Sequence, residues 1–226
     1  MQLAIDTATG TAILALIQNG KVQAEATWSC PQSHTTQLLP RLVDLLQQNK
    51  LSLQSTNCII VNRGPGSYNG LRVGISTAKG LAFSLGIPII GINALELEAY
   101  QHAETDLPIC PILNAGREEI ATAVYQKKDN EWSQLTAEYI TTVDQLCSQI
   151  TTKTIFCGEF VPSIADRLRK QLKQKAVIFP PTTESQRANL LARLGQLRIE
   201  ADEYDNPVTL QPLYLRRPQI TKPKHR

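Results

Sequence analysis

A glycine-rich segment, Gly64-Pro65-Gly66-Ser67-Tyr68-Asn69-Gly70, lies between a β-branched run and a helical pattern. A strand, such a turn and a helix N-terminus can together hold a phosphate, because backbone N–H groups and the helix dipole supply a positive field. The candidate phosphate-binding residues are Asp6, Gly64, Gly66, Ser67 and Gly70. The same glycines would also serve a tight loop at positive φ, and the sequence leaves both interpretations open.

The turn does not match the established nucleotide and hydrolase motifs. A P-loop needs a lysine after its second glycine, and the dinucleotide pattern G-x-G-x-x-G fails at Asn69. A nucleophile elbow G-x-S-x-G fails because Pro65 stands two residues before Ser67. The three histidines include no pair at i and i+4, and the five cysteines form no C-x-x-C. A zinc site, a disulfide framework and a peptidase triad are therefore not expected, and we expect no intrinsic cofactor or metal.

Two helical segments carry wider apolar faces than packing on one sheet requires. One face of the helix over residues 71–85 is apolar, and the opposite face is small and semi-apolar rather than charged. The apolar residues of the preceding helix cover an arc of about 160° at ~100° per residue. Pro40 is tolerable only near a helix start, so this helix is predicted to begin at Thr36 or Gln37. We expect these faces to bind another chain; the alternative is that they pack on each other and on the second half.

Composition and charge describe an ordinary globular chain. Of its 226 residues, 42% are hydrophobic and 19% charged, and no stretch approaches the ~20 apolar residues of a membrane span. Residues 216–226 hold five Lys/Arg and no acid, whereas the remainder has 18 basic against 20 acidic groups. Any attraction to nucleic acid would therefore concentrate in this tail, whose simpler interpretation is a solvated terminus. The N-terminus lacks secretory-signal features, so a cytoplasmic location is expected.

The order of elements predicts two β-rich α/β halves. Asn19-Gly20 lies between two strand-like runs, which is a strong hairpin signal. No sequence repeat is legible, so duplication is inferred from element order alone. The predicted domains are residues 1–104, residues 105–217 and a basic tail over 218–226. The predicted strands are residues 3–6, 11–18, 21–28, 58–62, 87–92, 109–113, 120–125, 139–142, 154–157 and 176–179, and further helices are expected over 94–100, 143–150, 162–172 and 185–204.

Four motifs stand in the first hundred residues. They are Ala4-Ile5-Asp6-Thr7-Ala8-Thr9, residues 33–40 (SHTTQLLP), residues 63–82 (RGPGSYNGLRVGISTAKGLA) and Ile87-Pro88-Ile89-Ile90-Gly91-Ile92. Together these motifs resemble the bacterial TsaB (YeaZ) family of threonylcarbamoyladenosine biosynthesis proteins. The second half matches that family only in element order, length and the segment 212–216.

The resemblance implies an actin-like, sugar-kinase-like fold of two related ribonuclease H-like halves, each a mixed sheet flanked by helices. It also implies a non-catalytic scaffold that binds and activates the catalytic relative TsaD, with the ATPase TsaE as a further partner. Contact with tRNA would come only through the complex, and the isolated protein would form a homodimer. The interface residues that the resemblance implies are His34, Leu38, Leu42, Leu45, Arg72, Val73, Ser76, Gly80 and Phe83.

Two departures from the family pattern concern nucleotide binding. The family usually has Phe-Thr where this chain has Tyr68-Asn69, and Asp-Ala-Arg where it has Asn114-Ala115-Gly116-Arg117. Without the aspartate of that second segment, Asp6 is the carboxylate left to bind a metal–nucleotide complex, and a single carboxylate makes a poor magnesium site. ATP or ADP at the subunit interface stays open. The alternative function is a small kinase or ATPase with Asp6 as base; a peptidase lacks any constellation that the three histidines could complete.

Overall fold

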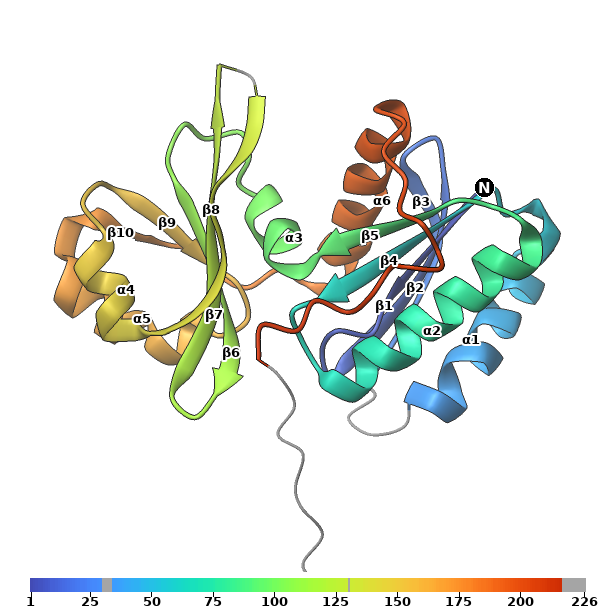
Figure 1. Cartoon of the computed structure of the whole chain (residues 1–226), viewed down its shortest axis with the longest axis horizontal. Coiled ribbons are helices and arrows are strands. Elements are labelled where there is room, and N and C mark those ends of the chain that lie inside the picture. Colours follow the sequence, from blue (N-terminus) through green and yellow to red (C-terminus); the bar gives the residue numbers. More distant parts are fainter. Residues whose placement is uncertain (30–33, 130, 217–226) are drawn as a thin grey trace, which may run out of the picture.

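The computed structural model describes residues 1–29, 34–129 and 131–216, with the side chain of His34 also outside the description. Two five-stranded sheets lie side by side, each with helices packed against it (Figure 1). The basic tail predicted over 218–226 lies outside the described residues.

The first sheet has the strand order β3-β2-β1-β4-β5. β2 runs antiparallel to β1 and β3, whereas β4 and β5 run parallel to β1. The predicted hairpin is confirmed: Asn19 and Gly20 both have positive φ, 50° and 70°. The strands are β1 (Gln2–Asp6), β2 (Thr11–Gln18), β3 (Lys21–Ser29), β4 (Cys58–Gly64) and β5 (Ile89–Asn93), and the helices of this half are α1 (His34–Gln48), η1 (Leu53–Ser55), α2 (Tyr68–Leu85) and α3 (Ala94–Tyr100).

The second sheet repeats this topology strand for strand. Its order is β10-β9-β6-β7-β8, so β6 takes the place of β1 and β9 that of β4. The helices follow the same sequence of connections, which confirms the two related halves inferred from element order. The elements are β6 (Ile109–Gly116), β7 (Glu119–Lys128), β8 (Glu131–Thr142), α4 (Val143–Gln149), β9 (Thr154–Cys157), α5 (Val161–Leu172), η2 (Lys173–Lys175), β10 (Ala176–Ile178) and α6 (Glu184–Glu200).

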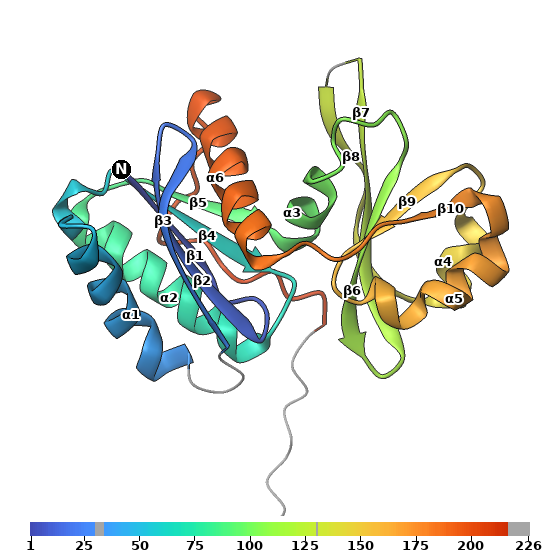
Figure 2. The same cartoon turned by 180° about the vertical axis from the view of Figure 1, so that it is seen from behind.

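The last helix crosses back to the first half. α6 contacts all five strands of the first sheet, and its Ala188, Leu191 and Leu194 are buried with Ile60 and Ile90. Figure 2 shows α6 on one face of that sheet and α1 and α2 on the other. The predicted boundary that placed residues 105–217 in one domain is therefore wrong at its C-terminal end, because the apolar face of α6 is buried against β1–β5.

Helix α1 begins earlier than predicted. It starts at His34, and Pro40 lies inside it. Proline removes one backbone donor, but α1 is held by tertiary packing: Leu38, Leu42, Leu45 and Leu46 are buried in the core under the first sheet. Burial of an apolar face outweighs a weak local propensity.

Candidate functional site

The glycine-rich turn packs directly on the β1–β2 turn of the same chain. The Ser67 amide donates to the Ala8 carbonyl oxygen at 2.6 Å, and the Thr7 hydroxyl donates to the Gly70 carbonyl oxygen at 2.8 Å. A Cβ on Gly66 would overlap the Ala8 carbonyl oxygen, and one on Gly70 would overlap that of Thr7. These glycines are required because two backbones approach closely.

The predicted phosphate cradle is therefore corrected. Ser67 caps α2 by accepting from the Gly70 amide at 3.3 Å, and the Gly64 amide donates to the Asn62 side chain at 2.9 Å. The amides of Gly64, Ser67 and Gly70 are thus used within the chain, and the Thr7–Ala8 backbone occupies the space beside Gly66.

Gly70→Ala should destabilise the fold, whereas Gly80→Ala in the same helix should not. The first substitution pushes a methyl group into the Thr7 carbonyl oxygen, and the second meets no atom within 4 Å. We expect the free energy of unfolding to fall by about 3 kcal/mol for Gly70→Ala and to stay or rise for Gly80→Ala. Urea denaturation measures both; equal stabilities would contradict the close approach.

Asp6 is held in a buried ion-pair network. Its side chain is 0% exposed, and it accepts from the Ala8 amide at 2.9 Å, the Asn62 amide group at 3.0 Å and Arg187 at 2.7 Å. Arg187, from α6, also pairs with the buried carboxylate of Glu98. Three donors thus contact the carboxylate that the kinase alternative would use as its base.

The cleft beside this network is acidic. A cavity of about 210 Å³ is lined by Thr9, Glu98, Glu159, Glu184 and Arg187 among other residues. Burial raises the pKa values of the Glu98 and Glu159 carboxyls. Arg187 is already paired with the carboxylates of Asp6 and Glu98, and three glutamates line the cavity beside this single guanidinium group.

The outer surface of α2 is exposed and partly apolar. Phe83 is 77% exposed; Arg72, Ser76 and Gly80 are also exposed, and Val73 is half-buried. These five residues fall within an arc of about 100° at ~100° per residue. The structure thus brings the five predicted α2 residues onto one surface, and their role in binding a partner stays a prediction.

The residues predicted on α1 need correction. Leu38, Leu42 and Leu45 are buried in the core of this chain, so their side chains are not available to a partner. The exposed apolar residues of α1 are instead Leu39 and Val43, at 51% and 49% exposure. Leu39 and Val43 lie within the wide apolar arc that the sequence predicts for this helix, but periodicity alone does not say which edge of the arc faces the sheet. The side chain of His34 lies outside the described residues.

Helices α1 and α2 contact each other and lie side by side on one face of the first sheet (Figure 2). We call Leu39, Val43, Arg72, Val73, Ser76, Gly80 and Phe83 the α1/α2 face. At the N-terminal end of α2, the Arg72 guanidinium lies 5.2 Å from the centroid of the Tyr68 ring, and the centroids of the Tyr68 and Tyr214 rings lie 5.1 Å apart. The C-terminal segment therefore supports the start of α2.

Within residues 1–29, 34–129 and 131–216, no group of three or more His, Cys, Asp or Glu side chains could hold a metal ion. In the same part of the chain, no helix has the length and apolarity that crossing a membrane requires.

Comparisons with known proteins find relatives that take part in threonylcarbamoyladenosine biosynthesis. A family model described as TsaD, tRNA N6-adenosine threonylcarbamoyltransferase, matches residues 29–219. The tRNA threonylcarbamoyladenosine biosynthesis protein TsaB of Bacillus subtilis is 31% identical over 217 residues, covering 95% of this chain and 93% of that protein. TsaB of Escherichia coli is 36% identical over 130 residues, 57% of this chain and 56% of that protein.

A solved structure shares the fold. It is described as an uncharacterized protein with similarity to peptidase YEAZ from Pseudomonas aeruginosa, and it aligns with a TM-score of 0.75 and 22% identity over 95% of this chain and 99% of that chain. The two mixed sheets flanked by helices form the actin-like, sugar-kinase-like architecture of two related halves. Because one relative is 31% identical over nearly the whole of both sequences, the chain belongs to the TsaB (YeaZ) family, and its role is in threonylcarbamoyladenosine biosynthesis on tRNA.

Proposed function

We propose that this protein is a non-catalytic scaffold that binds a TsaD-like threonylcarbamoyltransferase through the α1/α2 face and activates it. The observation that carries the proposal is the exposed apolar surface of two adjacent helices, with Phe83 at 77% exposure beside a glycine that leaves room for a second backbone. Contiguous apolar surface rimmed by polar residues is typical of a protein interface.

The inter-half cleft supports a non-catalytic role. Asp6, the carboxylate that the kinase alternative would use as its base, is buried against Arg187. The cavity next to it carries an excess of carboxylates. A small kinase or ATPase would need a carboxylate that is free to act as a base and a cavity whose charge attracts the phosphates of its nucleotide.

The other proposed partners rest on the same surface for the homodimer and on the family resemblance for the rest. In isolation the α1/α2 face would pair with a second copy, giving a homodimer. A TsaE-like ATPase would join the complex, ATP or ADP would sit at a subunit interface rather than in the acidic cleft, and tRNA would be reached only through the complex, in the cytoplasm.

Reconstitution with the TsaD-like subunit of the same source tests the proposal. Purified together, the two proteins should elute as a stable complex, and threonylcarbamoyladenosine on tRNA, measured by mass spectrometry with the other biosynthesis proteins present, should require both. The scaffold alone should form no product and consume no ATP. Full activity of the TsaD-like subunit without this chain, or ATP consumption by this chain alone, would contradict the proposal and favour the kinase alternative.

A further inference from the structure

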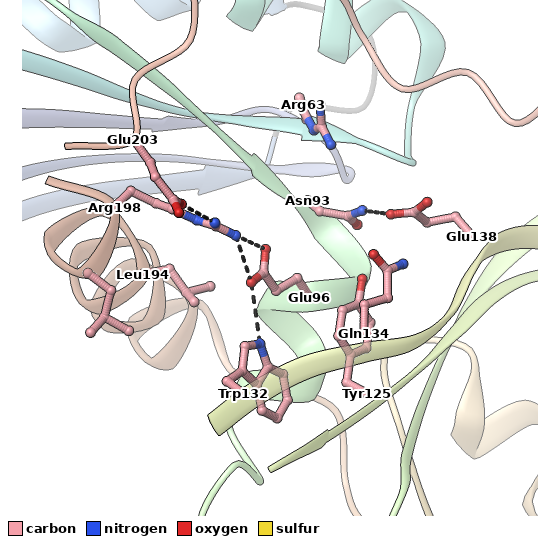
Figure 3. Close-up of a pocket in the computed structure, with 11 residues that line it drawn as sticks. Arg63, Asn93, Glu96, Tyr125, Trp132, Gln134, Glu138, Leu194, Arg198 and Glu203 are labelled. Carbon is pink, nitrogen blue, oxygen red and sulfur yellow. Dashed lines mark hydrogen bonds and ion pairs between the residues drawn. The ribbon is translucent and has the colours of Figure 1, made fainter. Parts of the chain in front are cut away.

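A second cavity, of about 310 Å³, lies between the two halves. Its walls come from β4, β5, α3, α6 and the segment after α6 on one side, and from β7 and β8 of the second half on the other (Figure 3). This volume is at the lower end of the range for small-molecule sites, and interfaces between domains are a preferred place for them.

Two polar groups on the cavity wall have no partner among the described residues. The Tyr125 side chain is 2% exposed, and its hydroxyl makes no hydrogen bond. The Arg63 guanidinium forms no hydrogen bond or ion pair with another described residue, and its Nε is buried. Burial raises the pKa of Tyr125, so its hydroxyl keeps its proton and can donate. Leaving buried donors without acceptors is unfavourable by about 1–3 kcal/mol each, so both groups are expected to have one.

The other charged residues of this cavity, except Glu138, are paired with one another. Arg198 pairs with Glu96 at 3.1 Å and with Glu203 at 2.5 Å, and the Trp132 indole donates to Glu96 at 3.3 Å. Glu138 receives a hydrogen bond from the Asn93 amide group and forms no ion pair with a cation of the described residues. One guanidinium and one carboxylate, Arg63 and Glu138, therefore face the same cavity from different halves without pairing with each other (Figure 3).

The charges on the cavity wall disfavour a simple ion as its natural occupant. Three carboxylates against two guanidinium groups disfavour a phosphate or other multiply charged anion, and the unpaired Arg63 disfavours a bare cation. A molecule that carries a negative and a positive charge close together can pair with Arg63 and with Glu138 at the same time.

We propose that this cavity binds a small zwitterion of the α-amino-acid type. The ligand carboxylate accepts from the Arg63 guanidinium and the Tyr125 hydroxyl, and its ammonium group donates to Glu138. Charge-assisted hydrogen bonds of this kind are about twice as strong as neutral ones. The site uses no residue of the α1/α2 face. Binding of a ligand here can therefore be tested separately from the proposed scaffold function.

Trp132 provides the signal for a test. Its ring stacks on Tyr125 at 5.5 Å between centroids, and Trp28 is the other of the two tryptophans. In the full-length Trp28→Phe protein, tryptophan fluorescence comes from Trp132 alone. Each common L-amino acid is titrated to about 10 mM, which detects a Kd in the millimolar range; calorimetry repeats each titration. We expect saturable binding of at least one amino acid, and at least about tenfold weaker binding of its N-acetyl and methyl-ester derivatives, each of which lacks one charge.

Variants assign the binding to this cavity. Arg63→Gln and Glu138→Gln should each weaken binding at least about tenfold, while Arg169→Gln, on exposed α5, should leave it unchanged. Tyr125→Phe should weaken binding several-fold without lowering the melting temperature, because it removes a hydroxyl that has no protein partner. No binding of any amino acid by either method, unchanged binding in Arg63→Gln, or equal binding of the one-charge derivatives would overturn the proposal.

Discussion

Replacing Gly80 with glutamate is expected to abolish the complex with the TsaD-like subunit while the protein stays folded. A side chain at this position meets no atom within 4 Å in the chain itself, and a residue other than glycine favours the helix by up to about 1 kcal/mol. In a closely packed interface the same carboxylate would be buried without a partner, which is strongly unfavourable. We expect Kd to rise at least about 100-fold, or roughly 2.7 kcal/mol, in calorimetric or biosensor titrations.

Two controls separate charge from general damage. Gly80→Ala adds a small group at the same place and should weaken binding less, and Ser163→Glu adds the same charge on the exposed surface of α5 and should have no effect. Circular dichroism melts should show no loss of stability for any of the three. Binding of the Gly80→Glu protein at wild-type affinity would exclude this surface as the interface.

Replacing Arg187 with methionine is expected to give the largest loss of stability. Methionine is apolar and of similar length, but it leaves the carboxylates of Asp6 and Glu98 buried without their cation. Breaking a buried pair from one side costs about 3–5 kcal/mol, which for a chain of this size lowers the melting temperature by roughly 10 °C. Arg169→Met, in the exposed pair with Asp166, should cost less than about 1 kcal/mol.

The loss should depend on pH with a defined sign. Burial already raises the pKa of Glu98 in the folded protein, and removal of Arg187 raises it further. The folded variant then binds protons that the unfolded chain releases, so its stability falls as pH rises from the ordinary carboxyl pKa of about 4.3 towards neutrality. The difference from wild type should therefore be smallest near pH 4 and largest near pH 7. A loss that is the same at all pH values would mean that packing, not charge, is what Arg187 contributes.

Local signals in the sequence predicted most elements. The Asn19-Gly20 hairpin, the apolar strand of residues 58–62 and the helix after the glycine-rich turn depend on near neighbours, and the structure confirms each. β8 was predicted only over residues 139–142, but it spans Glu131–Thr142. Its first residues are mostly exposed and polar, and its pairing with β7 contains register shifts, so the alternation that marks a strand is interrupted.

The functional surfaces were predictable only in part. The sequence predicted a small, semi-apolar outer surface on α2, and its five residues are exposed or half-buried, as a partner site requires. On α1 the apolar arc was too wide to orient, so buried Leu38, Leu42 and Leu45 were predicted in place of exposed Leu39 and Val43.

By itself the sequence determined the element order, the family motifs and the outward stripe of α2, because each depends on residues a few positions apart. Only the tertiary structure decided that Asp6 pairs with Arg187, which is 181 residues away, and that α6 belongs to the first sheet. It also decided that Arg63 and Glu138 share one cavity. These outcomes depend on how the two halves pack together, and no short-range pattern encodes the partner of a buried charge or the sheet that a helix covers.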